Sequence, residues 1–225
     1  MASPRQSIDA RVRARTARTS WFAATVVAAL ALSACATGQR PSFDADQPLV
    51  EDTGDAAVDA VLDRLDAVGI AQFTAGYTVL TRLGGLESAA TVVQADNSRR
   101  SITINDVRFL DGPSNAATCN LTTAECEAVI NDARVSDVQL THDFYASGPA
   151  RRLRVDEARK LAPATGYEAT IADRPATCAD VPVSGGTKTY CALDSGVLAK
   201  YDGNDLLIEL VSFSDVPDET RFETG

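Results

Sequence analysis

The chain has little of what enzymes and metal proteins use most: its 225 residues include one histidine, one methionine and one tryptophan. The lone histidine, His142, has no second histidine with which to build a metal site. A Ser-His-Asp hydrolase needs a nucleophile beside it, yet the chain contains no G-x-S-x-G elbow. A P-loop and a G-x-G-x-x-G turn are also absent from the sequence. We therefore expect no catalysis, no cofactor and no metal, and we place His142 at the surface or at a strand end.

Two triplets of the acid-protease type, Asp52-Thr53-Gly54 and Asp194-Ser195-Gly196, are the remaining sign of catalysis. Two such aspartates that share one proton carry out acid proteolysis. The first triplet lies between Glu51 and Asp55 in a polar stretch, and no apolar strand precedes it. The second is more simply explained as a turn between two strands. The sequence therefore favours a non-catalytic protein.

Positive charge is scarce as well, with 21 basic residues against 31 acidic ones and a net charge of −10. Five of the arginines and one aspartate lie in the first 34 residues. Without that segment the chain carries 16 basic and 30 acidic residues, a net charge of −14. Proteins bind phosphate backbones mainly through lysine and arginine, so nucleic acid is not an expected partner.

The first 34 residues have the three parts of an export signal. A segment with five arginines precedes an uncharged, apolar run from Trp21 to Leu32, and small residues then lead into a cysteine. The exit Leu32-Ser33-Ala34-Cys35 resembles the lipobox of bacterial lipoproteins. That resemblance implies cleavage before Cys35, acylation of its thiol with diacylglycerol, and a mature chain held on the extracytoplasmic face of the cell membrane. An ordinary signal peptide and a short membrane anchor are the alternatives.

Four cysteines remain after Cys35, an even number that predicts disulfides in an exported chain: Cys119, Cys126, Cys178 and Cys191. Three connectivities are possible, and the spacing favours Cys119 with Cys126 and Cys178 with Cys191. Closing these short loops stabilises the fold by about 2.5 and 3 kcal/mol in the chain-entropy model. Zinc-binding cysteine pairs are separated by about two to four residues, and these gaps are longer. Disulfides are therefore expected in place of a metal site.

The mature chain is expected to consist of a tether and one domain. Residues 35–54 are polar, are interrupted by glycine and proline, and show no apolar period, which is typical of a flexible tether. A single domain is expected over residues 55–223. It begins with an amphipathic helix over 55–68, because apolar side chains recur there at helical spacing. These side chains are Val58, Val61, Leu62, Leu65 and Val68.

Short stretches of alternating apolar side chains follow this helix, as expected for half-buried β-strands. We expect a loop at residues 112–117 and helices at residues 122–133 and 151–162, the first of them opened by the capping box Thr122-x-x-Glu125. The strands are predicted at residues 73–81, 88–94, 101–104, 107–110, 167–171, 177–183, 188–193, 197–201 and 206–213.

The turn Ser184-Gly185-Gly186 joins two of these strands and gives an independent check on the second disulfide. Pairing about Ser184 and Gly185 places residue 182 opposite 187, residue 180 opposite 189, and Cys178 opposite Cys191. The two cysteines then face each other on one side of the hairpin, as a cross-strand bridge requires.

Helices segregated from an antiparallel meander of strands define an α+β fold. With the lipobox, the helix after the tether and Tyr77-Thr78-Val79 at the start of the meander, the chain resembles the lipoprotein-carrier (LolA-like) fold and the actinobacterial lipid-carrying lipoproteins. The resemblance implies a curved antiparallel sheet, a half-barrel that wraps around helices and leaves an apolar cavity. A cystatin-like α+β fold is the alternative.

On that resemblance the chain is a membrane-anchored extracytoplasmic lipoprotein that binds a hydrophobic or lipidic ligand. The cavity wall would come from the helix and the first strand, with Val58, Val61, Leu62, Leu65, Tyr77 and Val79 as ligand-binding residues. The alternative is a non-catalytic envelope lipoprotein that acts as a protein-interaction module. A dry apolar cavity of roughly several hundred Å³ favours the first reading, and a filled core favours the second.

One basic cluster stands out in this acidic domain, and it consists of Arg151, Arg152, Arg154, Arg159 and Lys160. Such a cluster can meet anionic lipid headgroups near a membrane surface. Asp156 and Glu157 interrupt it, however, so a solvated helix face is the simpler interpretation.

Overall fold

The computed structural model describes residues 52–113 and 115–223, apart from the side chains of Ile70, Asn97 and Asn115. The predicted signal peptide, Cys35 and the tether up to residue 51 lie outside the described residues. Within the described residues, no helix is both long and apolar enough to cross a membrane.

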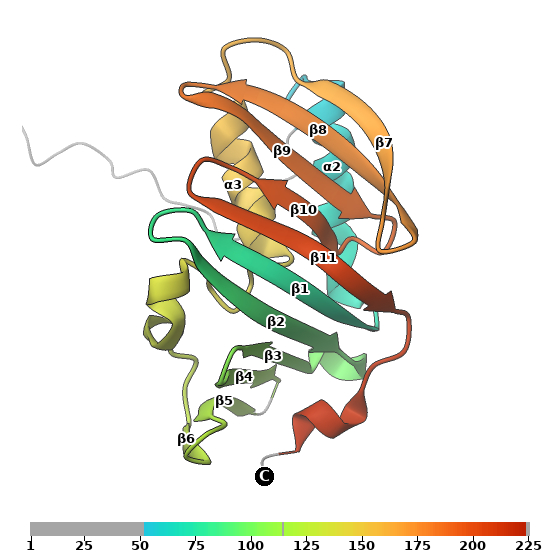
Figure 1. The fold of residues 1–225 in the computed structure, drawn as a ribbon. Helices are drawn as coiled ribbons and strands as arrows, with labels where there is room; N and C mark the ends of the chain where they lie inside the picture. The colour runs from blue at the N-terminus through green and yellow to red at the C-terminus, as the bar shows by residue number, and fades with distance from the viewer. Residues whose placement is uncertain (1–51, 114, 224–225) are drawn as a thin grey trace, which may run out of the picture. The chain divides into compact units, whose positions relative to one another are not determined.

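The described chain consists mainly of strands, with two α-helices and four short 3₁₀-helices (Figure 1). The helices are α2 (Ala56–Ala67), η1 (Val68–Ile70), η2 (Asp96–Ser98), η3 (Asp132–Val138), α3 (Ser147–Glu157) and η4 (Glu219–Phe222). The first six strands are β1 (Phe73–Thr81), β2 (Leu86–Gln94), β3 (Arg100–Ile104), β4 (Val107–Gly112), β5 (Asn115–Asn120) and β6 (Glu125–Glu127). The last five strands are β7 (Thr165–Ile171), β8 (Arg174–Val183), β9 (Gly186–Leu193), β10 (Leu198–Asp202) and β11 (Leu206–Ser214).

All of these strands form one antiparallel sheet of eleven strands in the order β6-β5-β4-β3-β2-β1-β11-β10-β9-β8-β7. Each half is a meander of consecutive hairpins, and the segment with η3 and α3 connects the two halves. The halves meet where β1 pairs with β11. The predicted antiparallel sheet is therefore confirmed, and it curves around the two α-helices (Figure 1).

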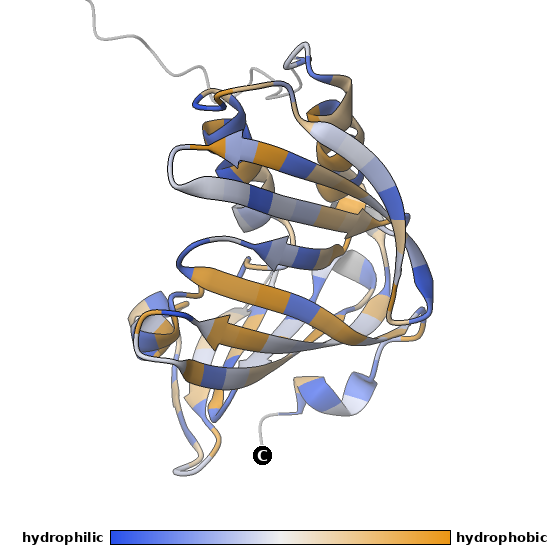
Figure 2. Cartoon of the chain, turned by 45° about the horizontal axis from the view of Figure 1, so that its top comes forward, coloured by the Kyte–Doolittle hydropathy of each residue, from blue (hydrophilic) through white to orange (hydrophobic). Residues whose placement is uncertain are grey.

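The predicted first helix forms as α2, and its apolar side chains are buried. The carboxylate of Asp55 caps its start by accepting a hydrogen bond from the backbone N–H of Ala57 at 3.2 Å. The buried face of the helix packs against β7, β8 and β9. Strand β1 also follows its pattern, because fully buried residues alternate along it with partly exposed ones. Figure 2 shows hydrophobic residues recurring along the strands with more hydrophilic ones between them.

The hairpin of β8 and β9 has the register that its turn predicts. Residue 182 lies opposite 187, residue 180 opposite 189, and Cys178 opposite Cys191. Cys178 and Cys191 form a disulfide, and both are buried. Cys119 and Cys126 form the other disulfide, so both predicted pairings agree with the structure.

Residues 112–133 were wrongly predicted, because they form a hairpin in place of a loop and a helix. β5 pairs with β6, and Cys119 lies opposite Cys126. The side-chain oxygen of Asn120 accepts hydrogen bonds from the backbone N–H groups of Thr122 at 2.8 Å and Thr123 at 3.1 Å. This local turn replaces the expected helix cap. A helix would also have had nothing to cover, since every residue from 121 to 129 is exposed.

Helix α3 begins at Ser147 and ends at Glu157, several residues earlier at each end than the predicted range 151–162. The earlier start has a local cause. The carboxylate of Asp143 accepts a hydrogen bond from the Ser147 hydroxyl at 2.8 Å, and the backbone carbonyl of Asp143 accepts one from the N–H of Gly148 at 3.1 Å. Pro149 then occupies the first turn, where its missing N–H is no loss.

Candidate functional site

The six residues predicted to bind the ligand lie in the packed core. Their side chains are between 0% and 4% exposed, and they are Val58, Val61, Leu62, Leu65, Tyr77 and Val79. The Tyr77 hydroxyl donates a hydrogen bond to the backbone carbonyl of Leu198 at 3.0 Å, and its ring packs edge-on against Phe144 at 5.2 Å. In the described part of the chain, three surface pockets were compared with this set, and none of the three is lined by any of the six residues.

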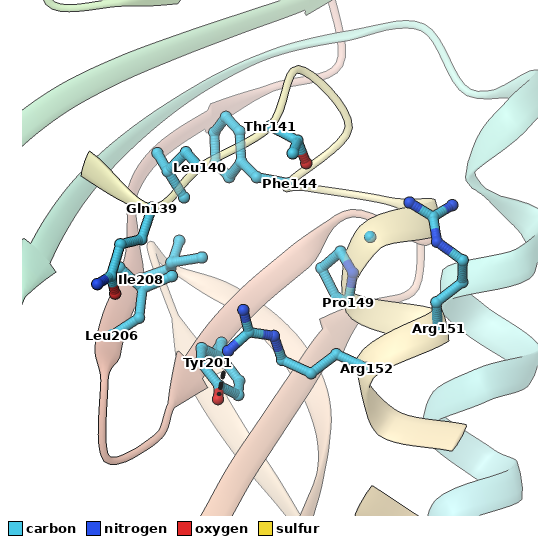
Figure 3. Close-up of a pocket in the computed structure, with 11 residues that line it drawn as sticks. Gln139, Leu140, Thr141, Phe144, Pro149, Arg151, Arg152, Tyr201, Leu206 and Ile208 are labelled. Atoms are coloured by element: carbon cyan, nitrogen blue, oxygen red, sulfur yellow. Dashed lines mark hydrogen bonds between the residues drawn. The ribbon is translucent and has the colours of Figure 1, made fainter. Parts of the chain in front are cut away.

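The largest of these three pockets has a volume of about 180 Å³ and lies between the η3–α3 connection and strands β10 and β11 (Figure 3). We call it the Arg152 pocket. Its lining residues are Gln139, Leu140, Thr141, Phe144, Gly148, Pro149, Arg151, Arg152, Tyr201, Leu206 and Ile208. It is adjacent to the predicted site, because Ile208 pairs with Val79 across the β1–β11 ladder.

The local sequence explains why the η3–α3 connection lies over the sheet at this point. The hydroxyl of Thr81 at the end of β1 donates a buried hydrogen bond to the carbonyl of Val138 at 3.0 Å. Gln139 then adopts a left-handed conformation with φ of 58°, which turns the chain back at the end of η3. Leu140 and Phe144 follow, and each is 4% exposed. They form one apolar wall of the pocket, and Leu206 and Ile208 of β11 form the facing wall (Figure 3).

Arg152 supplies a fixed positive charge to this pocket, whose lining is part polar and part apolar. Its Nη1 donates hydrogen bonds to the hydroxyl of Tyr201 at 2.9 Å and to the carboxylate of Asp205 at 3.0 Å. Its guanidinium also lies 4.8 Å from the centre of the Tyr201 ring, in a cation–π contact. Burial alone would lower the pKa of Arg152, but the hydrogen bonds that its guanidinium donates to Tyr201 and Asp205 outweigh burial and raise that pKa. Arg152 therefore stays charged and held in one orientation.

Arg151 contributes a second and more mobile positive charge. Its side chain is 61% exposed, and its Nη2 donates a hydrogen bond to Asp143. Burial would raise the pKa of Asp143, but hydrogen bonds from Thr141, Arg151 and Ser147 lower it below the usual value. Asp143 is thus ionised at neutral pH and sits behind the pocket wall. The lining itself contains two arginines and no acidic residue.

A partly buried ion pair holds the other side of α3 against the sheet. The carboxylate of Asp156 accepts two hydrogen bonds from Lys188 Nζ, at 2.7 and 2.9 Å, and one from the Tyr190 hydroxyl. Burial raises the pKa of Tyr190, and the hydrogen bond to Asp156 raises it further, so this phenol stays protonated. The Tyr190 ring lies 5.0 Å from that of Tyr201, which connects the ion pair to the pocket.

The residues first considered for catalysis do not line this pocket. Asp194-Ser195-Gly196 forms the turn between β9 and β10, as expected, and Asp194 pairs with Arg64 of α2. The carboxylate of Asp52 accepts a hydrogen bond from the N–H of Gly54. His142 Nδ1 lies 3.1 Å from a carboxylate oxygen of Asp132. Within residues 52–113 and 115–223, no cluster of three or more potential metal ligands is found.

Sequence reasoning missed most of the Arg152 pocket, and one signal pointed toward it. Arg151 and Arg152 were noted as part of a basic cluster and interpreted as a solvated helix face. Arg151 is indeed largely exposed, but Arg152 turns inward against Tyr201. Nothing in the spacing of Leu140, Phe144 and Ile208 brings them together before the sheet order is known.

No protein-family model matches the chain, and no curated protein was found to match it. Among solved structures, it is similar to a chain of the Pseudomonas aeruginosa MucA/MucB complex, with 14% identity and a TM-score of 0.49 over 75% of this chain and 61% of that one. A crystal structure of MucB gives 13% identity and a TM-score of 0.47, over 76% and 64% of the two chains. A DUF1329 family protein from Desulfovibrio piger gives 10% identity and a TM-score of 0.32, over 75% and 96%. The chain therefore spans about three fifths of the length of the MucB chains it matches.

Proposed function

We propose that this protein is an envelope lipoprotein, anchored in the cell membrane through Cys35, whose domain binds a partner protein through the Arg152 pocket and performs no catalysis. The anchoring part of the proposal rests on the lipobox Leu32-Ser33-Ala34-Cys35 and the segment before it. The binding part rests on the pocket, where apolar walls meet a fixed arginine in an otherwise acidic chain. The resemblance to the lipoprotein-carrier fold supports only the architecture, which is a curved sheet around helices.

The size of the pocket is the observation that favours a protein partner over a lipid. Sites for small molecules and cofactors usually have volumes of about 300–1,000 Å³. A dry cavity of about 150 Å³ holds a ligand of the size of benzene. With about 180 Å³, the Arg152 pocket accepts one apolar side chain, and a lipid with two acyl chains exceeds it. The stripe of α2, which was expected to line a lipid cavity, is packed against the sheet instead.

Site-specific photo-crosslinking in intact membranes tests this function. A photoreactive amino acid at Gln139, an exposed residue at the mouth of the pocket, should give an adduct whose added mass is that of a protein. The same group at Thr187, which is exposed on the β8–β9 hairpin, is the matched control and should give no such adduct. Filling the pocket with Ile208→Trp should abolish the Gln139 adduct, provided that a thermal melt shows the variant to be folded.

Two results of this experiment would contradict the proposal. An adduct with the mass of a lipid at Gln139 would support the carrier interpretation. Equal protein adducts at Gln139 and Thr187, both unaffected by Ile208→Trp, would show that contacts with the pocket are not specific.

A further inference from the structure

The charges that line the Arg152 pocket indicate the chemistry of what enters it. Of its eleven lining residues, two are arginines and none is acidic, although acidic residues outnumber basic ones in the chain by 31 to 21. The carboxylates that balance the arginines, Asp143 and Asp205, are not part of the lining. A ligand in the pocket therefore meets positive charge together with apolar surface, and an anionic group favours both on-rate and specificity at such a site.

The guanidinium of Arg152 is prepared to bind a carboxylate. Hydrogen bonds to Tyr201 and Asp205 use its Nη1, and the ring of Tyr201 supports one face. Within the described part of the chain, its Nε and Nη2 form no hydrogen bond to another residue. Figure 3 shows the guanidinium between Tyr201 and Pro149, on the side of the cavity opposite Leu140 and Phe144. An immobilised arginine loses little further entropy when it forms a bidentate pair with a carboxylate.

We propose that the Arg152 pocket selects an apolar group that carries a carboxylate, and that its natural occupant is the C-terminal residue of a partner chain. This inference rests on the proposed function. A C-terminal leucine or a residue of similar size combines the two features within one residue, and capture of a terminal carboxylate is a recurring mode of peptide recognition. A free fatty acid has the same chemistry at one end.

Gln139 favours the chain end over the fatty acid. Its side chain is exposed at the rim of the pocket, close to the apolar wall of Leu140. A carboxamide can donate to and accept from the peptide group that precedes a C-terminal residue. A fatty acid has only methylene groups at that position and offers the amide no hydrogen bond.

Titration calorimetry with small model compounds tests this proposal without knowledge of the partner. The protein is the chain from residue 35 with Cys35→Ser, so that no covalent lipid interferes. The compounds are N-acetyl-leucine, its amide N-acetyl-leucinamide, and hexanoate. We expect N-acetyl-leucine to bind about 10- to 100-fold more tightly than its amide, because hydrogen bonds to a charged group are stronger than those to a neutral one. Hexanoate should bind more weakly than N-acetyl-leucine.

Three variants that each remove one positive charge show which arginine causes the preference for the acid over the amide. Arg152→Gln and Arg151→Gln should each reduce the preference for the acid over the amide, and Arg159→Gln should leave it unchanged. Arg159 is exposed beyond the end of α3 and does not line the pocket, so it controls for the loss of one positive charge. Arg151→Gln keeps the test valid if the loss of the Arg152 contacts with Tyr201 and Asp205 unfolds the first variant.

Each outcome decides a different part of the proposal. Equal binding of acid and amide would overturn carboxylate selection and leave the pocket as an apolar binding site. Tighter binding of hexanoate than of N-acetyl-leucine would overturn the chain end as the occupant. No binding of any compound, at concentrations up to tens of millimolar, would overturn this inference, while the proposed function would still be decided by the Gln139 crosslink.

Discussion

Replacing Asp156 with alanine should lower the free energy of unfolding by up to about 3–5 kcal/mol, because it leaves a partly buried ammonium group without its partner. The Asp156 side chain is 8% exposed and that of Lys188 is 19% exposed. The substitution also removes the acceptor of the Tyr190 hydroxyl, which burial separates from water. Urea denaturation of the chain from residue 35 measures this loss of unfolding free energy. If unfolding stays two-state, the slope of the free energy against urea concentration should not change.

An exposed ion pair of the same kind is the matched control for Asp156. Asp202 pairs with Arg82 at 2.5 Å, and the two side chains are 35% and 41% exposed. Asp202→Ala should therefore cost less than about 1 kcal/mol. Equal losses for Asp156→Ala and Asp202→Ala would show that the ion pair between α3 and β9 is solvated and does not hold the helix in place.

Gly196→Ala should also be strongly destabilising and should lower the free energy of unfolding by about 2–5 kcal/mol. Two costs add here, a strained backbone conformation and a steric clash. Gly196 has φ of +84°, a conformation that side chains other than glycine's rarely adopt. An added Cβ would also lie 2.5 Å from the carbonyl oxygen of Arg64 and 2.7 Å from the backbone N of Val68. Both atoms belong to backbone at the end of α2, so the helix itself would have to move away from the β9–β10 turn.

Gly85→Ala separates the two costs, because this glycine also has a positive φ, +65°, but no atom within 4 Å of an added Cβ. Gly85→Ala should therefore lower the free energy of unfolding only by the cost of the backbone conformation, about 1 kcal/mol. If Gly196→Ala and Gly85→Ala had the same effect on the urea midpoint, the close approach of α2 to the β9–β10 turn would be refuted.

The parts of the fold that could be predicted are those that local pattern or covalent geometry fixes. The spacing of Val58, Leu62 and Leu65 identifies α2, since one buried stripe is enough to define a helix. The turn at Ser184 and Gly185 fixes the register of a whole hairpin, because a two-residue loop leaves only one pairing that brings the cysteines together.

The parts that could not be predicted depend on partners far apart in the sequence. β1 pairs with β11, more than 120 residues later, and no local pattern contains that pairing. The Arg152 pocket needs it, because Leu206 and Ile208 reach the pocket only in that register. The helix expected at residues 122–133 does not form, for a related reason. Its capping box is a local signal, whereas the disulfide to Cys119 and the absence of an apolar surface to cover decide the outcome.

Native mass spectrometry of the protein extracted from its own membrane tests the central claim most directly, since it weighs the chain, its covalent lipid and its bound partner together. The account predicts a chain that begins at Cys35, carries a covalent lipid and forms a complex with a second protein. It also predicts that Ile208→Trp removes the second protein and keeps the covalent lipid. A complex with non-covalently bound phospholipid and no second protein would contradict the account, because a pocket of about 180 Å³ is too small for such a lipid.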